Sequence, residues 1–90
     1  MAQATLSDIL NLLLEKKRQE AYLQLLAFLK SNPDSAHGWY MLGNLYRSQQ
    51  LWREAIDAYS RAKMIDPSGP ADAAIEALYA HLRDVPAEVI

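Results

Sequence analysis

The side chains that could do chemistry are few in this sequence. It has two histidines, His37 and His81, which fall in separate predicted helices, and it has no cysteine. Without cysteine, thiolate catalysis is excluded and a metal site would need carboxylates from elsewhere in the chain. The run from Asp34 to His37 contains the residue types of a catalytic triad, but nearness in sequence is not triad geometry. We therefore predict no enzymatic activity, no catalytic residues, no metal and no cofactor.

The charge balance argues against two further classes of function. With Asp+Glu 11 against Lys+Arg 9 and a net charge of -2, the chain has no basic excess to hold a phosphate backbone. The basic cluster Lys16-Lys17-Arg18 is flanked by Glu15 and Glu20 and falls at a predicted turn, where charge is normally solvated. No apolar run reaches the length of a membrane span, and the amino terminus lacks a signal pattern. We expect a cytoplasmic protein that binds neither nucleic acid nor membrane.

The elements that must position these residues are helices. A chain of 90 residues allows one domain, and its apolar residues recur at helical spacing in five segments without any alternating strand pattern. The expected core positions are Leu6, Ile9, Leu10 and Leu13; Ala21, Leu25, Phe28 and Leu29; Trp39, Leu42, Gly43 and Tyr46; Ala55, Tyr59, Ala62 and Ile65; and Ala74, Ile75, Leu78, Tyr79 and Leu82. The sequence therefore predicts an all-α fold of about five antiparallel helices.

Caps and prolines predict where these helices begin and end. Thr5 with Asp8 three residues later forms a capping box, and either Asp34 or Ser35 caps the third helix. Pro70 suits the first turn of the fifth helix. The segments close at Pro33, Pro67 and Pro86, so the last helix is expected to end near Asp84.

One segment, residues 36–69, resembles the tetratricopeptide repeat. The matching positions are Trp39, Leu42, Gly43, Tyr46, Ala55, Tyr59, Ala62 and Pro67. Gln50 stands in the turn, where the family often has glycine. The resemblance implies paired antiparallel helices that stack into an α-α superhelix, or α-solenoid, as in small stand-alone bacterial members of the family.

The rest of the chain is expected to complete a single domain over residues 1–90. Residues 3–34 are interpreted as a degenerate repeat. The apolar positions of its second helix lie 34 residues before those of the fourth helix, whereas the positions of its first helix lie 33 residues before those of the third. This difference predicts that the turn between the first two helices is one residue shorter than the turn between the third and fourth. Residues 70–84 read as a C-terminal capping helix, and residues 85–90 as a tail.

A helical projection places a second set of side chains opposite the core face of the first and third helices. These candidate ligand-binding residues are Ser7, Asn11 and Leu14 in the first helix and His37, Tyr40, Asn44, Arg47 and Ser48 in the third. The resemblance implies that this face lines a concave groove. Asn11 and Asn44 are expected at equivalent places, where an amide can bond a peptide backbone, and Arg47 can pair with a carboxylate.

Two functions remain open at this point. The first is a protein-interaction module, an adaptor or scaffold that binds a peptide or a partner's helix in this groove. The second is a structural unit that self-associates, as a homodimer or larger homo-oligomer, through uncovered repeat edges. For the second, Leu12 and the pair Val89-Ile90 are the expected exposed apolar residues.

Overall fold

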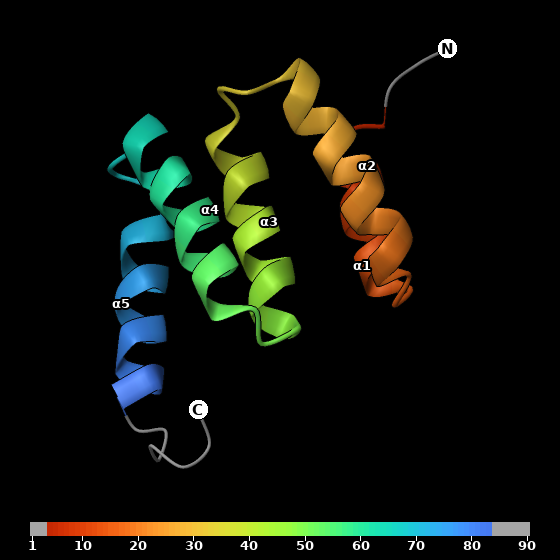
Figure 1. The fold of residues 1–90 in the computed structure, drawn as a ribbon. Helices are drawn as coiled ribbons and strands as arrows, with labels where there is room; N and C mark the ends of the chain where they lie inside the picture. Colours follow the sequence, from red (N-terminus) through yellow and green to blue (C-terminus); the bar gives the residue numbers. More distant parts are fainter. Residues whose placement is uncertain (1–3, 84–90) are drawn as a thin grey trace.

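The computed structural model describes residues 4–83, and this part of the chain is all helical (Figure 1). The helices are α1 (Leu6–Leu14), α2 (Arg18–Ser31), α3 (Ala36–Ser48), α4 (Trp52–Ile65) and α5 (Ala71–Arg83). Each helix packs against the next one along the chain, and the pair α3 and α4 makes the most extensive contact. The predicted all-α fold with five helices is confirmed.

The helix starts follow from local capping. The Thr5 hydroxyl accepts from the Asp8 amide at 3.2 Å, and the Asp8 carboxylate accepts from the Thr5 amide at 3.0 Å, which is the predicted capping box. Of the two candidates for the third helix, Ser35 is the cap, since its hydroxyl accepts from the Gly38 amide at 3.0 Å. Asp84 and the predicted tail lie outside the described residues.

The core consists of two clusters that meet at α3. The first cluster contains Ile9, Ala21, Leu25, Leu29, Met41, Leu42 and Ala58, and the second contains Ala55, Tyr59, Ala62, Ala71 and Leu78. Trp39 and Tyr46 are half-buried and pack against both clusters. These two aromatic residues of α3 therefore connect the two halves of the core.

Tyr46 also forms a joint with the preceding helix pair. Its ring meets the ring of Tyr22 edge-on, with centroids 5.8 Å apart, and the two hydroxyl oxygens are 3.3 Å apart. Burial, and then the hydrogen bond with Tyr22, raises the pKa of Tyr46 to about 12. Tyr46 is therefore a neutral packing residue at neutral pH.

Three residues predicted for the core are exposed instead. Leu10 is 49%, Ile65 40% and Tyr79 52% exposed. Ile65 is the last residue of α4, where the helix runs past its packing partners. In α5 the buried members of the second core cluster are Ala71 and Leu78, and Tyr79 is not among the residues packed against that cluster. Leu10 is exposed because the register of α1 relative to α3 differs by one residue from the predicted register.

The turns of the two helix pairs have the same length, which corrects the prediction of a shorter first turn. Lys16 and Gln50 both have φ 63, in the left-handed region, and they lie 34 residues apart. After each of them, the next backbone amide donates to the carbonyl of Leu12 in the first turn (2.8 Å) and of Tyr46 in the second (3.0 Å). The 34-residue register therefore extends into α1.

This register changes the role of Leu12. It occupies the place of Tyr46 and is half-buried against the first core cluster, so the prediction that it is an exposed edge residue is wrong. Ile9 occupies the place of Gly43 and is fully buried. Val89 and Ile90 lie outside the described residues.

The crossing of α3 and α4 depends on the missing side chain of Gly43. A Cβ at this position would overlap the ring of Tyr59, lying only 3.0 Å from its Cγ, and Tyr59 is fully buried. At Gly38, in the same helix, a Cβ would meet the flexible end of Leu29 at 2.9 Å. That Cβ would also lie 3.1 Å from Oγ of Ser35 and 3.3 Å from Cε1 of Phe28, but its nearest obstacle is a flexible side chain, whereas at Gly43 it is the Tyr59 ring.

We predict that Gly43→Ala is destabilising whereas Gly38→Ala is nearly neutral. Both substitutions gain about 1 kcal/mol of stability from the higher helix propensity of alanine. At Gly43 the added methyl group is also overpacked against the buried Tyr59 ring, which costs about 1–3 kcal/mol. Urea unfolding should show Gly43→Ala to be less stable than Gly38→Ala by about 1–2 kcal/mol. Equal stability of the two variants would contradict the close crossing.

Candidate binding groove

The five α3 residues predicted for ligand binding lie at two hollows between α3 and α5. The first hollow, of about 320 Å³, is lined by Ala36, His37, Tyr40, Ala62, Asp66, Gly69, Pro70 and Ala71. The second, of about 400 Å³, is lined by Asn44, Arg47, Ser48, Gln50, Trp52 and His81. The structure thus brings together His37, Tyr40, Asn44, Arg47 and Ser48 along one side of α3.

The middle of this face is anchored to the core by Tyr59. Its hydroxyl donates to Oδ1 of Asn44 at 2.5 Å, and its ring lies 5.7 Å from that of Tyr40. Burial raises the pKa of Tyr59, and the hydrogen bond and positive charge of Arg47 act in the opposite direction. Oδ1 of Asn44 therefore accepts from Tyr59, and among residues 4–83 no acceptor bonds its Nδ2, with the Arg47 guanidinium close by.

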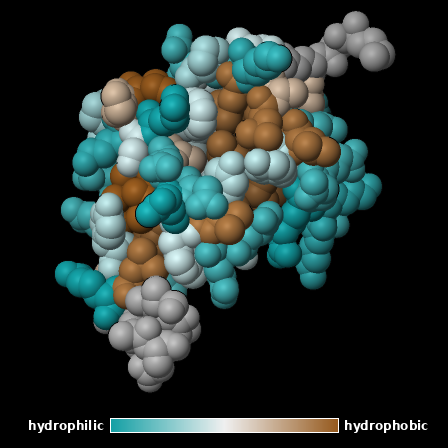
Figure 2. All heavy atoms as spheres, in the orientation of Figure 1, coloured by the Kyte–Doolittle hydropathy of each residue, from teal (hydrophilic) through white to brown (hydrophobic). Residues whose placement is uncertain are grey.

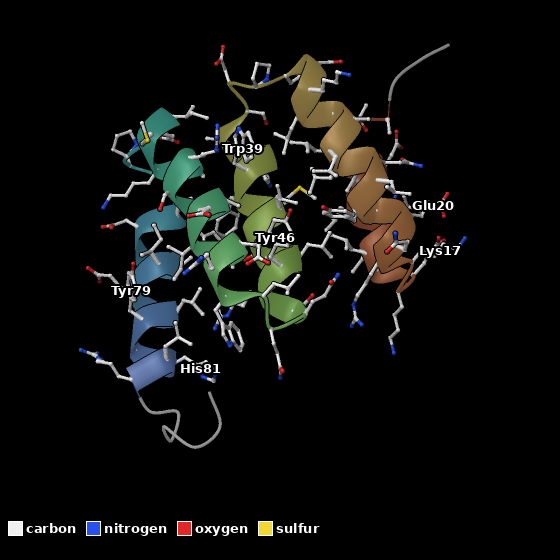
Figure 3. The ribbon with its side chains drawn as sticks, in the orientation of Figure 1. Lys17, Glu20, Trp39, Tyr46, Tyr79 and His81 are labelled. Atoms are coloured by element: carbon white, nitrogen blue, oxygen red, sulfur yellow. The ribbon has the colours of Figure 1, made fainter. Side chains whose placement is uncertain are left out.

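The second hollow has a floor that the sequence did not predict. The rings of Trp52, at the start of α4, and His81, near the end of α5, are in tilted contact, with centroids 5.3 Å apart and planes inclined at 59°. Figure 3 shows His81 at the end of α5 that lies nearest the α3–α4 turn. Because Trp52 and His81 are distant in sequence, no local pattern could have paired them. Asp66 and Pro70, in the first hollow, were missed for the same reason.

Three predicted residues of α1 line neither hollow. In the 34-residue register, Ser7 and Asn11 take the places of Met41 and Leu45, which are buried in α3. Both are exposed here, on the side of α1 where no described helix precedes it. The predicted equivalence of Asn11 with Asn44 is therefore wrong.

Leucines occupy the positions of α1 that correspond to Asn44 and Ser48 of α3. Leu10 takes the place of Asn44 and is 49% exposed, and Leu14 takes the place of Ser48 and is 73% exposed. In this register Leu10 and Leu14 of α1 correspond to the α3 residues at the second hollow, and they make the corresponding side of α1 apolar. Leu14 was among the candidate ligand-binding residues, whereas the 33-residue register assigned Leu10 to the core.

The arrangement offers contacts for binding and lacks the usual components of a metal centre. Within residues 4–83, no three histidine or acidic side chains come together as a metal ion would require. None of the helices in that part of the chain is long and apolar enough to cross a membrane. What the face does offer is an amide donor, a guanidinium, aromatic rings and two exposed leucines.

Two comparisons with known proteins agree with this geometry. Residues 36–68, which form α3, α4 and the turn between them, match the family model of the tetratricopeptide repeat, so this segment of the chain is a tetratricopeptide repeat. The chain is also 41% identical over 51 residues to the N-terminal acetyltransferase A complex auxiliary subunit NAA15 of Arabidopsis thaliana. That match covers 57% of this chain and 6% of the length of the plant protein. Tetratricopeptide repeats are non-enzymatic modules that generally mediate contacts between proteins.

We predict an energetic coupling between Asn44 and Tyr59. Asn44→Ala removes the acceptor of a hydroxyl on a buried ring, so the variant should lose about 1–2 kcal/mol of stability. In a double-mutant cycle with Tyr59→Phe, the coupling energy should be about 0.5–1.5 kcal/mol by urea unfolding.

Asn11→Ala is the matched control, because Asn11 is an exposed asparagine on the first helix of the other pair. It should change stability by less than about 0.5 kcal/mol. A cycle without coupling would show that the bond does not tie the groove face to the core.

Proposed function

We propose that the protein is an adaptor that binds a segment of another protein, an extended peptide or a helix, in the groove formed by α1, α3 and α5. The observation that carries this proposal is the Asn44–Arg47 pair, held beside an open hollow by the buried Tyr59. A face that is fixed in place before binding loses little conformational entropy when a ligand arrives. The plant relative supports the same class of function only through its printed name, the auxiliary subunit of a complex.

The groove chemistry indicates the character of the ligand. Nδ2 of Asn44 and the guanidinium of Arg47 are donors, so they suit carbonyl or carboxylate oxygens. The Ser48 hydroxyl already donates to the carbonyl of Leu45 at 2.6 Å, which directs it toward its own helix. Leu10 and Leu14 favour an apolar side on the same ligand. The best fit is a segment with an acidic or carbonyl-rich side and an apolar side.

The test uses peptides selected from a random displayed library on the immobilised wild-type protein. Arg47→Glu reverses the charge in the groove, and Arg53→Glu makes the same change on an exposed position of α4 that lines neither groove hollow. We expect the selected peptides to bind Arg47→Glu at least about tenfold more weakly, and Arg53→Glu as well as wild type. Affinity would be measured by fluorescence polarisation.

Unchanged binding by the Arg47→Glu variant would contradict the proposal. If every selected peptide binds Arg47→Glu with unchanged affinity, the groove is not the binding surface. Arg47→Glu must remain as folded as wild type by circular dichroism, which its exposed position permits.

A second candidate function, self-association, is favoured by the exposed leucines of the first helix pair. Leu10 and Leu14 on α1 and Leu23 on α2, which is 56% exposed, are large apolar side chains in contact with solvent. Self-association through this end of the molecule would cover them. We therefore propose these three residues as the interface in place of Leu12, which packs against the core.

The solution mass separates the two candidates. If the protein self-associates here, light scattering across a hundredfold concentration range should give at least twice 10.2 kDa, and Leu14→Glu should return it to the monomer without loss of stability. Leu12→Glu should instead destabilise the fold by about 2 kcal/mol or more, because Leu12 packs against the core. A constant monomer mass for wild type would remove this candidate.

A further inference from the structure

A third hollow lies away from the groove, between the α2–α3 loop and the end of α4. It measures about 430 Å³ and is lined by Pro33, Trp39, Arg61, Met64 and Ile65. None of these residues lines the two groove hollows. Figure 3 shows Trp39 at the opposite end of the molecule from His81, so a ligand here would be distant from the Trp52 and His81 rings of the second groove hollow.

The wall of this hollow is a fixed aromatic surface. Nε1 of Trp39 donates to the carbonyl of Pro33 at 2.9 Å, which holds the indole in one orientation and uses its single donor. The ring also packs against both core clusters. The indole therefore contributes a rigid apolar wall that leaves a ligand no unsatisfied polar group to pair.

The rim of the hollow is unusually apolar for a surface. Met64 is 82% exposed, and Ile65 beside it is 40% exposed. Figure 2 shows hydrophobic surface near the end of α4, separated by polar surface from the larger hydrophobic area over α2. A flexible methionine next to a fixed tryptophan suits side chains of different shapes.

The charge of the hollow selects among possible ligands. The guanidinium carbon of Arg61 lies 4.9 Å from the centroid of the Trp39 ring. Within residues 4–83 no carboxylate lies within ion-pair distance of Arg61, and the ion pairs there join Lys17 to Glu15 and Lys63 to Asp72. A cation stacked on an aromatic ring beside exposed apolar side chains complements a ligand that is both acidic and apolar.

We infer that this hollow, the Trp39–Arg61 site, is a second docking site for a partner protein, one that presents a large aliphatic or aromatic side chain next to an acidic residue. The apolar side chain enters between Trp39 and Met64, and the carboxylate pairs with Arg61. Because it shares no lining residue with the groove hollows, it allows the adaptor to hold two segments at once. Two weak contacts on one partner then act together through their effective concentration.

The test follows the indole N–H signals of the two tryptophans by NMR, since Trp39 reports on this site and Trp52 on the groove. The probe is a hexapeptide, Ser-Asp-Leu-Phe-Glu-Ser, with both ends blocked. Its neutral analogue has Asn and Gln in place of the acids, and its basic analogue has Lys at both. We expect a saturable shift of the Trp39 signal with the acidic peptide, about fivefold tighter than with the neutral one, and none of Trp52.

Variants on α4 then assign the contacts. Arg61→Gln should remove the difference between the acidic and neutral peptides, whereas Arg53→Gln, the same change on the same helix, should leave it unchanged. Met64→Ser should weaken all peptides about fivefold while leaving the charge preference. All three variants change exposed side chains, and urea unfolding of each tests that the fold is retained.

Several outcomes overturn the inference. It fails if the Trp39 signal does not move up to about 10 mM peptide, or if the three peptides bind equally. Preference for the basic peptide would place the interaction at the neighbouring loop hollow, which contains Asp34. A Trp39 signal that changes on dilution of the protein alone would mean that a second copy covers the hollow. A shift of Trp52 alone would support the groove and reject this site.

Discussion

The close crossing of α3 and α4 is the constraint on which the rest of the structure depends. With no side chain at Gly43, the ring of Tyr59 can lie flat against α3, where it is fully buried. The hydroxyl of the same ring bonds Asn44, the next residue of α3 after Gly43. One side chain therefore closes the core and fixes the α3 face that we propose for binding, so core packing and the geometry of that face are coupled. A change that moves this ring must disturb both.

The two helix pairs use the same geometry with different chemistry. In both turns a residue other than glycine adopts the left-handed conformation, Lys16 in one and Gln50 in the other, and this keeps the pairs in a common register. At the crossing, however, Ile9 replaces Gly43, and on the groove face Leu10 replaces Asn44. The repeat thus preserves backbone positions while its exposed side changes from apolar to polar along the molecule. Such a gradient suits a ligand that is itself amphipathic.

The surfaces of the molecule differ in how firmly their residues are held. Asn44 is anchored by Tyr59, and Trp39 by the carbonyl of Pro33, so both offer fixed contacts. Leu14 and Met64 are largely exposed and free to adapt. Both the groove and the Trp39–Arg61 site combine a fixed element with an adaptable one. This combination gives orientation from the first and tolerance of different partners from the second.

The sequence by itself determined the helices, the Thr5 cap and the identity of the second repeat, because capping and helical periodicity act between residues a few positions apart. It also placed His37, Tyr40, Asn44, Arg47 and Ser48 on one side of a helix, which the structure retains. Only the tertiary structure decided the register of α1, since a 33- or 34-residue spacing keeps leucines on some face of that helix either way. It likewise decided the contact of Trp52 with His81 and the stacking of Arg61 on Trp39, because these contacts join residues that no local pattern relates.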